Sequence, residues 1–330
     1  MYYDDKIDTI KDIFGVEEVK YEKDAIIIGD KLFPILNDVI ILLDPSDYSN
    51  YLNRELSNNS TLKTNKKIAE DIQFTFGEEW KKYNKILPEH NNEFNNYFDL
   101  INIDNLADKR VCDLGCGIGR WAYFLHKNVR EMILIDFSDA IFEARKNLID
   151  SQNSIFFMAD LKQLPLREKF ADFLYCIGVL HHLPSPAIDE VRALSKFSHH
   201  LLIYLYYSID NKPLLYRFLF GMVTLIRFVI SRIRNQFIRS IITEIFLWLI
   251  YIPLIGIGHC ASIIGLEKHI PLFEGYKGNS LKRIRQDIYD RIFTRIEQRF
   301  SRKNIYELNN TFSKIKISDK IPYWHFTCEK

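Results

Sequence analysis

The chain has 330 residues, of which 47% are hydrophobic and 26% are charged, as in ordinary globular proteins. Its 44 Lys and Arg residues nearly balance 43 acids, so a net charge of +1 gives no general attraction to nucleic acid. No CxxC pair occurs among its five cysteines, which argues against a zinc site or a disulfide framework and favours a reducing, cytoplasmic compartment. The first 20 residues lack the apolar stretch of a signal peptide, so we expect no secretion.

The first 108 residues are predicted to precede the main unit. Residues 1–47 contain a helix over 7–14 and strand-like runs at 25–28 and 39–43 with turn residues between them, which indicates a small α+β module. Residues 48–108 begin with a stretch rich in Asn, Ser and Lys and continue into a helical segment. We interpret them as a linker leading to the core.

From residue 109 to residue 207, apolar runs of strand length alternate with helical segments. This alternation predicts a parallel sheet that is covered by helices on both faces. The expected strands are 110–114, 132–136, 154–158, 172–177 and 200–206, and the expected helices are 120–127, 139–149 and 188–197. Residues 291–330 resume this rhythm, with a helix near 302–310 and strands at 314–318 and 323–328.

A glycine-rich turn follows the first core strand and reads D-L-G-C-G-I-G over residues 113–119. A dinucleotide-binding turn would place its third glycine one residue later, and Asp113 would repel a pyrophosphate. The acid suits a ligand ammonium group instead, which disfavours a nucleotide-dependent oxidoreductase. A glycine turn without a ligand is the alternative. However, three glycines lose more backbone entropy on folding than other residues would, and the sequence shows no packing contact that requires them.

Two further acids lie at the ends of the next two expected strands. Asp136 is suited to accept hydrogen bonds from ribose hydroxyls, and Asp160 to bind an adenine amino group beside the backbone of Leu161. Taken singly, either acid is equally well explained as a turn or helix cap. Because ligands of open α/β sheets bind at the carboxyl ends of the strands, three acids at successive strand ends favour a nucleoside site.

Residues 109–207 resemble a class I S-adenosylmethionine (SAM)-dependent methyltransferase, of the kind that includes quinone-biosynthesis methyltransferases. The resemblance rests on D-L-G-C-G-I-G-R at 113–120, L-I-D-F-S at 134–138, M-A-D-L at 158–161, and A-D-F-L-Y-C followed by V-L-H-H-L within 171–183. It implies a Rossmann-like seven-stranded sheet and SAM as the cofactor. The residues that it implies at the cofactor are Asp113, Gly115, Cys116, Gly117, Gly119, Asp136, Phe137, Asp160, Leu161 and Ile177.

Two weaker resemblances concern the segments before the core. Residues 76–80, F-G-E-E-W, are similar to a segment of bacterial relatives that closes over the cofactor, although a helix that packs Phe76 and Trp80 into the core explains them as well. Residues 25–46 resemble the second half of the zinc-ribbon-like domains that partner methyltransferases, but the metal-binding cysteines are missing. We therefore expect a structural or docking module there and no zinc.

Methyl transfer requires the acceptor to lie in line with an activated methyl group, and some acceptors also need a general base. His181 and His182 follow the fourth core strand, so either is a candidate base; capping of the next turn is the alternative. Tyr204, Tyr206 and Tyr207 are candidates for lining the acceptor pocket. We expect a small-molecule, glycan or lipid-linked acceptor, and the alternative is a SAM-binding scaffold or regulator without transfer activity.

Residues 208–290 are predicted to form a helical insertion before the last two strands. Residues 212–243 contain six basic residues and no acid, and on one continuous helix the five arginines would share a side. Residues 245–266 carry no formal charge. Three interpretations remain: a lid over the acceptor pocket, peripheral attachment of 212–266 to an anionic membrane, or a transmembrane span. RNA methylation is disfavoured, because no basic, aromatic-rich surface occurs outside the insertion.

Overall fold

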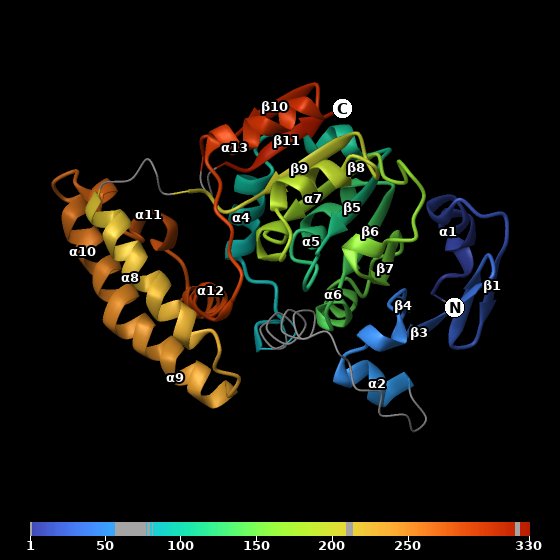
Figure 1. Ribbon diagram of the computed structural model, residues 1–330, viewed down its shortest axis with the longest axis horizontal. Coiled ribbons are helices and arrows are strands. Elements are labelled where there is room, and N and C mark those ends of the chain that lie inside the picture. Colours follow the sequence, from blue (N-terminus) through green and yellow to red (C-terminus); the bar gives the residue numbers. More distant parts are fainter. Residues whose placement is uncertain (1, 57–76, 78–79, 81, 209–213, 321–323) are drawn as a thin grey trace.

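The computed structural model describes residues 2–56, 77, 80, 82–208, 214–320 and 324–330. Its strands form one mixed sheet in the order β1-β2-β3-β4-β7-β6-β5-β8-β9-β11-β10, and Figure 1 shows helices on both sides of its central part. The expected Rossmann-like α/β architecture is therefore present. The whole sheet has eleven strands rather than the expected seven, because four strands of the N-terminal region join the seven strands of the core.

The centre of the sheet consists of five parallel strands whose residues are almost all buried. They are β5 (Arg110–Leu114), β6 (Glu131–Asp136), β7 (Ser154–Met158), β8 (Phe173–Ile177) and β9 (His200–Tyr204). Strands buried on both faces have little room for polar side chains, which explains their continuous apolar runs. The predicted core strands are confirmed to within two residues at each end.

Two C-terminal strands complete this central region. β11 (Phe326–Glu329) pairs antiparallel with β9, and β10 (Lys314–Ile317) pairs antiparallel with β11. The last strand begins at Phe326 rather than at residue 323, and residues 321–323 lie outside the described part. The short helices α13 (Arg302–Tyr306) and η9 (Glu307–Asn310) precede β10, at the predicted position.

The helices between the core strands are shorter than predicted. They are α5 (Ala122–Leu125) with the 3-10 turn η4 (His126–Asn128), α6 (Ala140–Asn147), and α7 (Ala187–Leu194), with short turns η5 (Leu161–Gln163) and η6 (Leu180–His182) at strand ends. The order of strands reverses at β5, which has β6 on one side and β8 on the other. In open α/β sheets a ligand site lies at the carboxyl ends of the two strands at such a switch point.

The N-terminal region extends the same sheet. η1 (Asp4–Lys6) and α1 (Ile7–Phe14) lead into β1 (Val19–Glu22), β2 (Ala25–Ile28), β3 (Lys31–Leu36) and β4 (Val39–Ile41), and β4 pairs parallel with β7. The next elements are η2 (Pro45–Asp47), α2 (Asn50–Leu56), α4 (Glu89–Tyr97) and η3 (Ile103–Leu106). The expected likeness of residues 25–46 to a zinc-ribbon-like domain stays a prediction.

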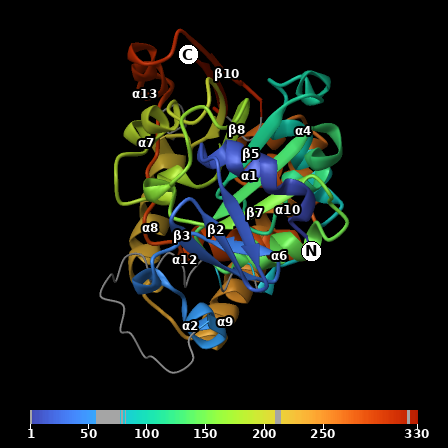
Figure 2. The ribbon, with the colours of Figure 1, turned by 90° about the vertical axis from the view of Figure 1, so that its right-hand side faces the viewer.

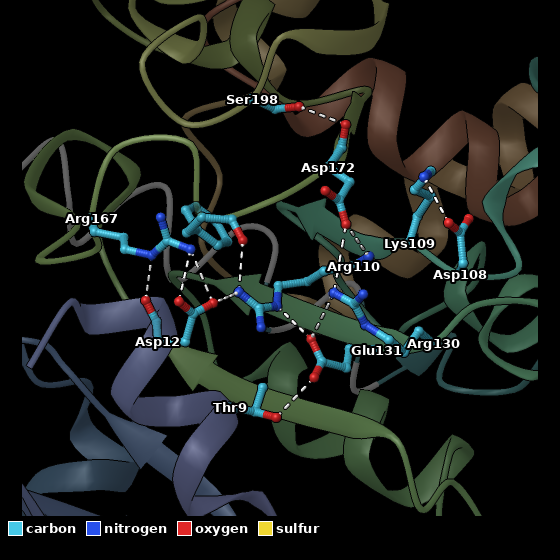
Figure 3. A network of polar contacts seen from close by, with 11 residues as sticks. Thr9, Asp12, Asp108, Lys109, Arg110, Arg130, Glu131, Arg167, Asp172 and Ser198 are labelled. Atoms are coloured by element: carbon cyan, nitrogen blue, oxygen red, sulfur yellow. Dashed lines mark hydrogen bonds and ion pairs between the residues drawn. The ribbon is translucent and has the colours of Figure 1, made fainter. Parts of the chain in front are cut away.

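A polar network joins α1 to the amino ends of the core strands (Figure 3). Arg110, at the start of β5, donates from Nε to Glu131 Oε2 over 2.5 Å and from Nη1 to Asp12 Oδ2 over 2.5 Å. Arg167 also donates to the Asp12 carboxylate, and Thr9 donates to Glu131. These contacts lie at the end of the strands opposite the switch-point site, so their role is to hold α1 against the sheet.

The insertion consists of helices that lie to one side of the sheet in Figure 1 and therefore behind it in Figure 2. They are α8 (Leu214–Ile230), α9 (Gln236–Phe246), the π-helical turn η7 (Leu247–Tyr251), α10 (Ile252–Ser262), η8 (Glu267–His269), α11 (Phe273–Tyr276) and α12 (Leu281–Phe293). The expectation of one continuous helix over 212–243 is wrong. The Asn235 side chain accepts hydrogen bonds from the N–H groups of Phe237 and Ile238, so it starts a new helix.

Candidate cofactor and active site

The glycine turn follows β5 and is attached to the neighbouring strand β6. The N–H groups of Gly115 and Cys116 donate to the carbonyl oxygen of Ile135 over 2.7 and 3.1 Å. Gly115, Gly117 and Gly119 all have positive φ, at 77°, 54° and 71°. These are left-handed conformations that residues with a Cβ rarely adopt, which explains why glycines alternate in this turn.

Neighbouring side chains occupy the space that a Cβ would take at each of these glycines. A Cβ on Gly115 would lie 2.4 Å from Val179 Cγ2, and one on Gly119 would lie 2.8 Å from Leu148 Cδ1. A Cβ on Gly117 would lie 3.2 Å from Cε2 of the Trp80 indole. The expectation that packing does not require these glycines is therefore wrong. Because packing alone explains them, evidence for a ligand must come from other residues.

Trp80 is the described end of the segment that resembles a cofactor-covering element. Its ring lies on Gly117, and the guanidinium carbon of Arg120 is 5.5 Å from its centroid. The indole thus contacts the glycine turn. Phe76, Glu78 and Glu79 lie outside the described residues.

Asp113 is buried at the carboxyl end of β5, and its Oδ2 has no hydrogen-bond partner among the described residues. Burial raises the pKa of Asp113 to about 8, and the nearby charge of Asp136 adds to the rise. The Tyr175 hydroxyl lies close enough to lower this pKa, yet it too lacks a well-formed hydrogen bond among the described residues. An unpaired buried acceptor costs about 1–3 kcal/mol, so a ligand that donates to it would relieve an existing penalty.

Asp136, the last residue of β6, fastens the glycine turn. Its Oδ2 accepts the N–H of Gly117 over 2.8 Å, while its Oδ1 accepts the N–H and the hydroxyl of Ser138 over 2.8 and 2.7 Å. A carboxylate offers about four acceptor positions, so one position remains on Oδ2. Burial raises the pKa of Asp136 despite these bonds. Ser138 is a supporting residue that the sequence analysis missed.

Asp160 and Leu161 follow β7, the strand next to β6. Asp160 Oδ1 accepts the N–H of Lys162 over 2.9 Å and caps the 3-10 turn that starts at Leu161. The N–H of Ala159 donates to the carbonyl oxygen of Asp136, so the ends of the two strands lie together. The structure thus brings Asp113, Asp136 and Asp160 to one edge of the sheet, with the last two also serving as local caps.

The other predicted cofactor residues surround this edge. Ile177 is the last residue of β8, beside the Gly178–Val179 segment that packs on Gly115. Cys116 is buried within the turn, and burial raises the pKa of its thiol well above the ordinary value. Phe137 is partly buried and packs against the core next to Asp136. No three His, Cys, Asp or Glu residues gather as metal ligands within the described ranges.

His181 and His182 lie just beyond β8 and are both buried. His182 Nδ1 is 2.8 Å from the carbonyl oxygen of Ile296, so this nitrogen donates and the ring is held by the chain before β10. The His181 ring stacks on Tyr206 with centroids 3.9 Å apart. Burial lowers the pKa of His181 well below its ordinary value, so this ring is neutral and one of its nitrogens carries a lone pair that can accept a proton.

Residues 290–300 cover the histidine pair, a contribution that the sequence did not reveal. The Tyr206 hydroxyl donates to Asp290 Oδ2 over 3.1 Å, and the Gln298 side-chain amide donates to the carbonyl oxygens of Leu183 and Ser185. Arg299 donates to the carbonyl oxygen of Tyr207 over 3.1 Å. Tyr206 and Tyr207 thus belong to the same covered region as the histidines, and Tyr204 packs edge-on to His181.

The chain between β5 and β9 matches a known protein family. Residues 111–201 fit the family described as "Methyltransferase domain". Over these residues the α/β unit is similar to a methyltransferase domain. The match covers Asp113, the glycine turn, Asp136, Asp160 and the histidine pair, and it confirms the expectation of a methyltransferase for this part of the chain.

Two curated relatives share sequence with the methyltransferase domain. A 23S rRNA uracil C5 methyltransferase from Pseudomonas fluorescens is 32% identical over 101 residues, which are 30% of this chain and 22% of that protein. A ubiquinone biosynthesis O-methyltransferase from Nitrosomonas europaea is 31% identical over 99 residues, which are 28% of this chain and 40% of that protein. The chain thus spans less than half of the length of either relative.

Solved structures of methyltransferases are also similar. Magnesium protoporphyrin IX methyltransferase from Synechocystis, solved with bound SAH, is 16% identical over 84% of this chain and 90% of its own, with a TM-score of 0.36. A SAM-dependent methyltransferase from Aquifex aeolicus is 20% identical over 41% of this chain and 77% of its own, with a TM-score of 0.33. At such scores the likeness carries no argument about the acceptor.

Proposed function

We propose that this protein is a SAM-dependent methyltransferase that transfers the methyl group to a small-molecule, glycan or lipid-linked acceptor. The observation that carries the proposal is the buried Asp113 carboxyl group, whose Oδ2 lacks a partner among the described residues at the switch point of a methyltransferase domain. The α-ammonium group of SAM supplies the donor that this oxygen lacks. Its positive charge also favours the ionised carboxylate that burial disfavours.

The residues around Asp113 fit the remainder of the cofactor. One acceptor position remains on Asp136 Oδ2, which suits a single ribose hydroxyl, while its other bonds keep the glycine turn in place. Asp160 and Leu161 lie at the adjacent strand end, where an adenine base would be placed. SAM contributes an already activated methyl group on a sulfonium, so the main task of the protein is to align the acceptor.

We infer that His181 is the general base where the acceptor needs one. Its ring is neutral, and the stacked Tyr206 ring and the covering segment 290–300 exclude water from it. His182 instead positions this segment through its bond to Ile296. Removal of a general base lowers turnover about 10²–10⁴-fold while leaving cofactor affinity intact.

The proposed function is tested by supplying the purified chain with SAM and extracts of small molecules, glycans and lipids, and measuring S-adenosylhomocysteine by mass spectrometry. Formation of this product with one extract identifies the acceptor class. The alternative, a scaffold or regulator, predicts that SAM binds and that no extract yields product. If SAM does not bind at all, both proposals fail. For the whole protein we propose a cytoplasmic location.

A further inference from the structure

Exposed apolar side chains are concentrated in the insertion. Of the 21 large hydrophobic residues that are exposed in the described part of the chain, 16 lie between Val223 and Leu266. The exposed fractions are high: 74% for Phe237, 72% for Leu249 and 84% for Ile263. Single exposed apolar residues are ordinary, but such a concentration in one segment marks a surface that a lipid phase or another molecule covers.

The helical run from Gln236 to Ser262 has one covered side and one open side. Arg239, Thr243, Leu247 and Tyr251 are buried at helical spacing, on the side that packs against α12. Between them, exposed apolar side chains lie at Ile241, Ile245, Trp248, Leu249 and Ile250. We name the exposed apolar side chains of α8, α9, η7 and α10 the insertion face; Leu225, Phe228, Phe237, Trp248 and Leu249 belong to it.

The run is long and apolar enough to cross a membrane: an 18-residue window within it has a mean hydropathy of 2.0, and 22% of that window is buried. Its two charged residues nevertheless bond to α12. Arg239 donates to the Tyr289 hydroxyl over 3.1 Å, and Arg285 donates to Glu244 Oε1 over 2.6 Å. A spanning helix would carry the ionised groups of α12 into hydrocarbon, which is strongly unfavourable. This packing favours a helix that lies on a membrane over one that crosses it.

Basic residues lie at both ends of the helical run. The α8–α9 turn exposes Arg232 and Arg234, and the segment after α10 exposes Lys268 and His269. The α8–α9 turn and the chain after α10 lie at opposite ends of the group of helices at the left of Figure 1. Residues 214–270 contain six Lys and Arg residues against two acids, so the region as a whole complements an anionic surface.

We propose that the insertion face docks the protein on the surface of a membrane containing anionic lipids. The apolar side chains enter the boundary between headgroups and acyl chains, and the basic residues at the two ends of the group of helices contact lipid phosphates. Arg227 and Arg239 take no part in this contact, because Arg227 pairs with Glu297 and Arg239 is buried against Tyr289. Apolar insertion is therefore the main attraction, and charge adds to it. The docking does not depend on methyl transfer.

The test is flotation of the detergent-free, full-length chain with vesicles of phosphatidylcholine, with and without one quarter phosphatidylglycerol. We expect the protein to float with the anionic vesicles and more weakly with the neutral ones. The double variant Phe237→Asp and Leu249→Asp should lower the partition coefficient at least tenfold. The matched control is Leu32→Asp and Ile149→Asp, because these residues are also exposed, at 58% and 59%, but lie outside the insertion. The control should float like the wild type.

The depth of docking is measured through Trp248, which is 53% exposed on the insertion face. Lipids brominated near the headgroup should quench its fluorescence more strongly than lipids brominated near the ends of the acyl chains; the reverse order would overturn interfacial docking. Absence of flotation with both vesicles would also overturn it. A third result would overturn it: the protein does not bind vesicles but forms a dimer, and Phe237→Asp dissociates that dimer. In that case a second copy of the chain covers the insertion face.

Discussion

Val179 fills the space beside Gly115, so that a Cβ on this glycine would lie 2.4 Å from Val179 Cγ2. The contact joins the carboxyl ends of β5 and β8, the two strands at which the order of the sheet reverses. The glycine turn is therefore fixed from one side by Val179 and from the other by the Asp136 bond to Gly117. The proposed cofactor site depends on both constraints.

Gly115→Ala should therefore destabilise the protein and its cofactor site more than the strain of a left-handed Ala backbone alone explains. Both Gly115 and Gly178 have positive φ, at 77° and 82°, but nothing lies within 4 Å of a Cβ on Gly178. Gly178→Ala should lower the free energy of unfolding by ~1–2 kcal/mol from the left-handed backbone alone. Gly115→Ala should lower it further and weaken SAM binding at least tenfold. Denaturant unfolding and calorimetry of both variants measure the difference; equal effects would contradict it.

Asp113→Asn should stabilise the ligand-free protein while weakening cofactor binding. The pKa of Asp113 is about 8 in the folded protein, above its ordinary value of about 4. The folded state thus holds this proton more tightly, so the carboxyl group destabilises the fold increasingly as the pH rises from about 4 to about 8. An amide does not ionise, so we expect a gain of about 1–3 kcal/mol at pH 8.5 and little gain at pH 4.5. Thermal unfolding at the two pH values checks this; a gain that is larger at the lower pH would refute it.

Arg110→Met should destabilise the protein by about 2–3 kcal/mol, because it leaves the partly buried Glu131 carboxylate and Asp12 without their closest cation. Arg130→Met is the matched control. Arg130 is 53% exposed and lies 3.7 Å from Glu131, so its loss should change stability by less than about 1 kcal/mol. Urea unfolding measures both variants. SAM affinity should be unchanged in each, since the network lies at the opposite end of the strands.

His181→Asn should lower turnover about 10²–10⁴-fold if the acceptor requires a general base, with SAM affinity unchanged. His182→Asn should act differently, because the wild-type ring holds residue Ile296 through Nδ1. Its loss should lower stability by roughly 0.5–1.5 kcal/mol and raise the acceptor KM more than it lowers kcat. Steady-state kinetics with the identified acceptor separate the two roles; wild-type turnover by the His181 variant would remove it from the mechanism.

The central sheet was predictable because strands buried on both faces must be continuously apolar, and glycine-rich turns and acids mark their ends. β1 and β3 were less visible, because their residues are only partly buried and Pro34 interrupts the second of these strands. The insertion was misjudged for a different reason. Projecting residues 212–243 onto a helix assumes that they form one helix, but Asn235 starts a new one. The projection also assumes that all the arginines face solvent, but Arg239 is buried.

Within the site, the strand-end acids were found because chain order places them at one edge of the sheet. Ser138 is a local partner of Asp136, two residues further along the chain, and it was overlooked. The contacts of Val179 with Gly115 and of Asp290 with Tyr206 could not be predicted, because they form only through tertiary folding. The glycine spacing indicated a turn correctly. It did not indicate that Val179, Trp80 and Leu148 would fill the space above the three glycines.

Titration calorimetry of the wild-type chain with S-adenosylhomocysteine tests the cofactor site most directly, because this product keeps the α-ammonium group proposed to meet Asp113. We expect one-to-one binding. At pH 6.5 the Asp113 carboxyl group of the free protein is protonated and the amine of the ligand is charged, so binding should release about one proton from Asp113. This release makes the measured heat depend on the ionisation enthalpy of the buffer. Asp113→Asn should bind more weakly and release none. Absence of binding to the folded wild-type chain would contradict the proposed site, and binding without proton release would contradict the role of Asp113.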